Sequence, residues 1–123
     1  GLARIFRALV SEPDFIETTA AVARHTPLTS DGTSPEARLT RWTPSIAKGG
    51  AEGCIGLGML EHGLAFAAKS WSGSMTAAAV AIVELMERVG VLPPYQREQL
   101  EPVARPHVFG GGRPVGSLEL IES

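Results

Sequence analysis

The sequence has a single cysteine, Cys54, among its 123 residues, so no disulfide can form within the chain. Its charges nearly balance, and the formal net charge of −2 at pH 7 provides no basic field for nucleic acid or anionic lipid. No apolar run reaches the roughly 18 residues that a membrane span needs. We therefore expect a cytoplasmic protein that binds neither nucleic acid nor membrane.

Residue groupings that would carry metal or nucleophilic chemistry are also missing. The three histidines, His25, His62 and His107, lie in or beside expected loops and lack the paired spacing of metal ligands. None has a context that indicates a Cys–His nucleophile pair. The sequence therefore predicts no metal site built from this chain alone, although Cys54 could supply one ligand to a site completed elsewhere.

Three consecutive glycines, Gly110 to Gly112, precede Arg113 and raise the question of a phosphate-binding loop. Such a loop leads into the N-terminus of a helix, whereas Pro114 follows here. The pattern therefore favours the tip of a hairpin.

The chain does have ample apolar material. A hydrophobic content of 44% over 123 residues is enough for the core of one domain. We find no internal repeat and expect residues 1–123 to form a single unit. Because the chain begins with Gly1 and has no initiator methionine, we expect it to be part of a longer sequence.

Apolar periodicity and cap residues predict alternating helices and hairpins. The predicted helices are residues 1–10, 13–24, 35–42 and 75–89, and residues 95–103 are expected to form a short amphipathic turn or helix. The predicted strands are 45–59, 64–71, 107–109 and 115–121. Ser34 is expected to cap the third helix, Ser72 or Ser74 to cap the fourth, and Gly90 to end it. We expect Trp42 and Trp71 to pack in the core or against a hairpin.

The stretch from Ser45 to Met59 is the candidate site. If it is one extended segment, alternation places Lys48, Gly50, Glu52 and Cys54 on the same face. Its many glycines weaken a strand and are typical of places where a ligand or another backbone comes close. The alternative is an exposed Lys–Glu pair of little energetic consequence, with Cys54 as a small buried apolar residue.

A family resemblance rests on this stretch. The segment Lys48-Gly49-Gly50-Ala51-Glu52-Gly53, then a second strand Gly63 to Lys69, then a long alanine-rich helix, resembles the C-terminal part of the L-asparaginase II family. The resemblance extends to Gly1-Leu2-Ala3-Arg4, Ala104-Arg105-Pro106 and Val115-Gly116, so it covers nearly the whole chain.

The resemblance implies an α/β (α+β) fold in which helices cover an antiparallel sheet, as in the C-terminal part of serine β-lactamase-like and glutaminase-like domains. It further implies hydrolysis of L-asparagine to L-aspartate and ammonia. Such enzymes activate a serine through a Ser-x-x-Lys motif. This chain has no such motif, so we expect the nucleophile on an absent N-terminal remainder of the enzyme and an inactive isolated chain. A homo-oligomer is also expected.

By the same resemblance, Lys48 and Lys69 are the catalytic candidates, and either could hold the carboxylate of the substrate or tune the nucleophile. The alternative for Lys69 is a solvated strand residue without a role in the site. Gly49, Gly50 and Glu52 are implied to bind substrate. Cys54 would be structural or a zinc ligand, with the other zinc ligands mainly outside this chain.

The chain departs from the family pattern after its second-strand lysine. Family members usually carry an Asp-Gly and an arginine there, whereas residues 70–75 read Ser-Trp-Ser-Gly-Ser-Met. This difference leaves a second hypothesis open, a non-catalytic scaffold domain that binds a partner or a small amide.

Overall fold

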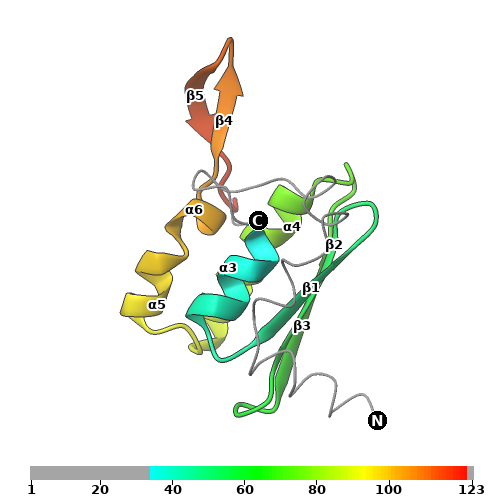
Figure 1. Ribbon diagram of the computed structural model, residues 1–123, viewed down its shortest axis with the longest axis vertical. Helices are drawn as coiled ribbons and strands as arrows, with labels where there is room; N and C mark the ends of the chain where they lie inside the picture. Colours follow the sequence, from blue (N-terminus) through cyan, green and yellow to red (C-terminus); the bar gives the residue numbers. More distant parts are fainter. Residues whose placement is uncertain (1–33, 122–123) are drawn as a thin grey trace.

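The computed structural model describes residues 34–121 of the chain, and the helices expected within residues 1–10 and 13–24 lie outside that range. The described part has helices on one face of a three-stranded sheet and a separate hairpin at its C-terminal end (Figure 1). Its elements are α3 Pro35–Trp42, β1 Ile46–Gly50, β2 Cys54–Met59, β3 Leu64–Lys69, α4 Met75–Val89, α5 Pro94–Gln99, α6 Glu101–Ala104, β4 His107–Gly110 and β5 Arg113–Ser117. The expected α+β fold with an antiparallel sheet and covering helices is confirmed.

The expectation of one strand from residue 45 to 59 was wrong, because the chain reverses direction at residues 51–53. Glu52 and Gly53 have φ angles of 60° and 71°, which an extended strand does not contain. Two successive residues in this conformation turn the chain back. The stretch therefore forms β1 and β2 of a hairpin, with Gly50 opposite Cys54 beside the turn.

The sheet has the order β1-β2-β3, and both pairs of strands are antiparallel. Its inner face carries Ala47, Ile55 and Leu57, which are buried against the helices. The opposite face, here called the open face, carries Lys48 on β1, Gly56 on β2 and Ala67 on β3 in one row. Lys48, Gly56 and Ala67 are all exposed.

Helix α4 forms because its ends are capped and one stripe of its surface is apolar. Ser74 accepts a hydrogen bond from the Ala77 N–H at 3.1 Å, and Gly90 ends the helix at φ 81°. The buried stripe packs on β2 and β3 and includes Ile82, Val83 and Met86. The expected bounds and caps of this helix are confirmed.

Helix α3 covers β1. Ser34 caps it as expected, and its Oγ accepts from the Ala37 N–H at 3.2 Å. The Thr40 hydroxyl accepts a hydrogen bond from the Ala47 N–H at 3.0 Å, which joins α3 to β1. This N–H is bonded to α3 and not to β2, because β1 is one of the two edge strands of the sheet in the described part of the chain.

The two tryptophans differ in how far their side chains are buried. Trp42 packs against the core and makes an edge contact with Tyr95, with ring centroids 6.3 Å apart. The prediction for Trp71 was wrong, since its side chain is fully exposed. The reason is that β3 ends at Lys69 and the chain turns at Gly73 (φ 79°) before α4 begins.

The C-terminal hairpin has the expected glycine tip, but β5 ends at Ser117 and not at residue 121. It projects from the rest of the described chain, and every residue of β4 and β5 is exposed (Figure 1). Within residues 34–121, none of the helices has the length and hydropathy that a bilayer crossing requires.

Candidate functional site

The turn between β1 and β2 is held against the loop that leads into α4. The Ser70 N–H donates to the Gly53 carbonyl at 2.9 Å. A Cβ placed on Gly53 would lie 2.5 Å from the Gly73 carbonyl carbon and 2.9 Å from the Ser74 nitrogen. Real Cβ atoms do not approach backbone this closely, so only glycine fits at position 53. The turn is therefore a fixed part of the sheet edge.

Lys69 strengthens the same contact. Its Nζ donates to the carbonyl oxygens of Glu52 and Ser70, the latter at 3.1 Å. Glu52 belongs to the β1–β2 turn and Ser70 to the loop after β3, so one ammonium group joins the two segments. The structure thus gives this predicted catalytic lysine a clear bridging contact between backbone segments.

Lys48 lies in a different environment on the same face. Its side chain is exposed, and among the described residues its amine has no hydrogen bond or ion pair. It stands opposite Gly56, and a Cβ built on Gly56 would meet no atom within 4 Å. The next residue in that row is Ala67, about 10 Å from Lys48 by strand spacing. No side chain of the described residues therefore fills the space beside the lysine at Gly56.

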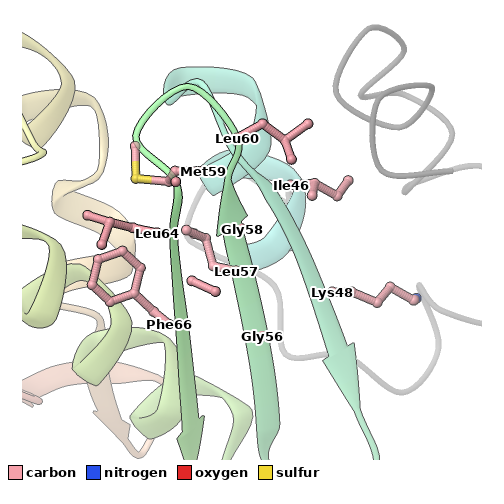
Figure 2. Close-up of a pocket in the computed structure, with 11 residues that line it drawn as sticks. Ile46, Lys48, Gly56, Leu57, Gly58, Met59, Leu60, Leu64 and Phe66 are labelled. Atoms are coloured by element: carbon pink, nitrogen blue, oxygen red, sulfur yellow. The ribbon is translucent and has the colours of Figure 1, made fainter. Parts of the chain in front are cut away.

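A cavity of about 460 Å³ lies beside Lys48 and Gly56. Figure 2 shows Lys48 and Ile46 extending to one side of the sheet and Leu64 and Phe66 to the other. The cavity is lined by Ile46, Lys48, Gly56, Leu57, Gly58, Met59, Leu60, Gly63, Leu64, Ala65 and Phe66. Among the residues that the structure describes, Lys48 is the one ionisable side chain in this lining, so an anionic group entering the cavity would be attracted to it.

The other predicted site residues lie around the turn. Gly50 and Cys54 form the last pair of the hairpin, and Cys54 is opposite Lys69 on its other side. Hairpin pairing therefore keeps Lys48, Gly50 and Cys54 on one face, as expected. They lie on two paired strands, however, and not on a single strand. Glu52 does not join that row, because it lies exposed at the turn with φ 60°.

Gly49 points to the inner face, where it meets a residue that the sequence did not single out. A Cβ on Gly49 would collide with Oε1 of Glu36, which lies in the first turn of α3. The Glu36 side chain is 3% exposed. An acid in a first helical turn is common and normally solvated, so the burial of Glu36 was not expected from its position in the sequence. The one available signal was the glycine inside a strand, which marks close approach.

The thiol of Cys54 does not make a zinc site with its described surroundings. Residues 34–121 contain no group of three or more histidine, cysteine, aspartate or glutamate side chains placed to hold a metal. Zinc needs about four ligands in a structural site and three in a catalytic one.

The sequence of the chain is similar to that of a known protein family. A family model described as L-asparaginase II matches residues 1–120 of the chain. A search of curated proteins gives no match to the sequence. The match spans the β1–β2 hairpin, β3, α4 and the C-terminal hairpin, so it covers every element described above.

Proposed function

Because the chain belongs to the L-asparaginase II family, we propose that it is the C-terminal portion of an amidohydrolase domain that converts L-asparagine to L-aspartate and ammonia. The observation that carries the proposal is the family match over residues 1–120. The position of Lys48, exposed and beside the unfilled space at Gly56, supports it, because an amino-acid substrate brings a carboxylate that needs a cation.

In this proposal Lys48 binds the α-carboxylate of L-asparagine. Its amine is exposed and has no partner within residues 34–121, so it is available for a charge-assisted hydrogen bond. Gly50 and Gly56 lie beside it on the open face and leave room for the substrate backbone. This contact orients the side-chain amide of the substrate towards a nucleophile.

The reaction itself is acyl transfer to a serine supplied by residues outside this chain. The serine oxygen attacks the amide carbon, the amide nitrogen leaves with a proton as ammonia, and water then hydrolyses the ester to release L-aspartate. Backbone N–H groups would stabilise the oxyanion that forms in each step. Residues 34–121 contribute the substrate contact and the rigid sheet edge.

Lys69 has a different role in the proposal. Its amine is engaged with the carbonyl oxygens of Glu52 and Ser70. It therefore positions the β1–β2 turn and, through it, the Lys48 strand. A role of Glu52 in substrate binding is retained, because its side chain is exposed at the turn.

The direct test is ammonia release from L-asparagine by the full-length protein as purified. Ammonia release with formation of L-aspartate supports the proposal. No ammonia from a folded full-length protein that contains a Ser-x-x-Lys motif would overturn it.

A second candidate function has one observation in its favour. The loop after Lys69 carries neither the acid nor the base of the family pattern, and the hydroxyls of Ser70 and Ser72 bond to each other at 2.9 Å. A scaffold that binds a small amide without hydrolysing it is consistent with this loop. Calorimetry with L-asparagine separates the two, because binding without ammonia release would identify the scaffold.

A further inference from the structure

The cavity beside Lys48 lies on the open face of the sheet. Within residues 34–121, its lining includes no residue of α3 or α4, the helices that cover the inner face. The side chains of Leu57 and Met59 are only 3% and 1% exposed because they pack in the core, so these two residues border the cavity through their backbone. A ligand in the cavity would therefore lie on the same face as the Lys48 side chain.

The cavity extends from Lys48 towards the turn between β2 and β3. Lys48 is paired with Gly56, and the next row of the open face towards that turn consists of Ile46, Gly58 and Ala65. A Cβ built on Gly58 would meet only the Ile46 Cγ2, at 3.9 Å. From Gly56 to the end of β2 is three residues, or about 10 Å. The space next to the ammonium group thus continues along the strands over small and apolar residues.

The charges around the cavity are complementary to a monoanion and not to a zwitterion. The carboxylates nearest to the lining residues in the sequence, Glu52 and Glu61, lie in the turns at the two ends of β2 and do not line the cavity. The ammonium group of a free amino acid would therefore meet no acidic side chain of the described residues there, and apolar surroundings disfavour an unpaired charge. The lining matches a carboxylate that is joined to an uncharged, apolar body.

The size of the cavity also exceeds what L-asparagine requires. A volume of about 460 Å³ is within the range of pockets that hold drug-sized ligands, roughly 300–1,000 Å³. Leu60 lines its far end in the β2–β3 turn, extends to the same side of the sheet as Ile46 (Figure 2) and is 49% exposed. L-Asparagine bound to Lys48 has no apolar group that could cover this leucine.

We propose that the site accepts asparagine whose α-nitrogen carries an apolar acyl chain, and that this chain binds in the cavity. This inference rests on the proposed function and names a further substrate class for it. The free α-carboxylate pairs with Lys48, and the acyl chain extends over Gly58 towards the β2–β3 turn. Acylation replaces the ammonium group by a neutral amide, so the substrate becomes the monoanion that the lining matches.

The reaction on such a substrate is the one proposed for L-asparagine. The bond between the side-chain carbonyl carbon and its nitrogen breaks, water supplies the oxygen of the new carboxylate, and the nitrogen leaves with the protons of ammonia. The products are N-acyl-L-aspartate and ammonia, and the amide bond to the acyl chain stays intact.

The test measures ammonia release by the full-length protein from L-asparagine and from its N-acetyl, N-butanoyl and N-hexanoyl derivatives. We expect kcat/KM to rise by at least about tenfold from the acetyl to the hexanoyl derivative, because each fully buried methylene group contributes about fourfold. If kcat/KM stays constant or falls along this series while L-asparagine is hydrolysed, the inference is overturned.

A variant that fills the cavity locates the acyl chain. Gly58→Leu places a large side chain on the open face, and we expect the ratio of kcat/KM for the hexanoyl derivative to kcat/KM for L-asparagine to fall about tenfold. Gly116→Leu is the matched control, since Gly116 is a strand glycine of β5 outside the cavity and its Cβ would also meet no atom within 4 Å. It should leave the ratio unchanged.

A melting temperature for each variant without substrate shows whether it is folded. If Gly58→Leu lowers this temperature, Ala65→Leu serves as the second variant, because Ala65 is exposed opposite Gly58 in the same row. Its effect on the ratio should again be a fall. A ratio that neither folded variant changes would overturn the inference.

The same assays separate failure of the inference from failure of the proposed function. Ammonia release from L-asparagine without a gain from the acyl chain removes the inference and leaves the amidohydrolase proposal in place. If the wild type releases ammonia from none of the four compounds, the proposed function fails, and the acyl-chain site fails with it.

Discussion

The two lysines of this chain lie on one face of one sheet but in opposite situations. Lys69 on β3 donates to two backbone carbonyl oxygens and joins the β1–β2 turn to the loop before α4. Lys48 on β1 has no hydrogen bond or ion pair within residues 34–121 and stands beside the unfilled space at Gly56. The contacts of each ammonium group, more than its place in the sheet, indicate what it does.

The same difference extends to their surroundings. Around Lys69 the chain is closely packed, because Gly53 contacts the backbone of Gly73 and Ser74. Around Lys48 the open face is hollow, with about 460 Å³ of free volume and small side chains along it. A region built to be rigid thus adjoins a region built to admit a ligand, as expected for a site on a stable scaffold.

The largest predicted effect is on Lys48. Lys48→Met keeps the apolar stem and removes the charge, so we expect kcat/KM for L-asparagine to fall by about a hundredfold to a thousandfold. The free energy of unfolding should change by less than about 0.5 kcal/mol, because the side chain is exposed. Steady-state kinetics and urea unfolding of the full-length protein measure the two quantities. Normal turnover in this variant would remove Lys48 from the site.

The second prediction concerns the closely packed turn at Gly53, near Lys69. Gly53→Ala places a Cβ 2.5 Å from the Gly73 carbonyl carbon at a φ of 71°, so we expect the free energy of unfolding to fall by about 2–4 kcal/mol. Gly63→Ala is the matched control, since its φ is 63° but its Cβ meets nothing within 4 Å. It should cost only about 1 kcal/mol, the backbone term alone. Equal costs would mean that the turn is not held by the Gly73–Ser74 contact.

The third prediction is smaller and tests the bridging role of Lys69. Lys69→Met removes two exposed hydrogen bonds to carbonyl oxygens, and we expect a loss of about 1 kcal/mol in the free energy of unfolding. We expect kcat/KM to fall only about fivefold or less, because the group acts through the turn. Lys48→Met provides the opposite pattern in the same assays. If Lys69→Met abolishes turnover without loss of stability, Lys69 contacts the reacting groups directly.

Local signals in the sequence predicted much of this fold. Ser34 and Ser74 cap the helices that they were expected to cap, and Gly90 ends α4, because side-chain and backbone chemistry decide helix ends locally. The β2–β3 hairpin followed from Gly63 for the same reason. The turn at residues 51–53 was missed, because Glu52 adopts a backbone conformation that its residue type disfavours.

The candidate site was predicted only in part for a related reason. The face that carries Lys48 follows from alternation along a strand, which is visible in the sequence. The burial of Glu36 against Gly49 depends on how α3 packs on β1, and the bridge from Lys69 to Glu52 depends on the docking of two loops. Contacts between segments far apart in the chain have no periodic signal, so the sequence could not reveal them.

The smallest predicted effect lies at Glu52, where the rigid and open regions meet. A non-glycine residue at φ 60° costs about 1–2 kcal/mol, and glycine would relieve that cost while making the unfolded chain more flexible. We therefore expect Glu52→Gly to raise the free energy of unfolding by about 0.5 kcal/mol, with the Lys69 bridge intact because it uses the Glu52 carbonyl. Glu52→Ala removes the same carboxylate but keeps the strain, so it should show no gain. A fall in kcat/KM common to both variants would show that the Glu52 carboxylate takes part in substrate binding. Strained backbone conformations cluster at functional sites, where they serve the site at a cost in stability.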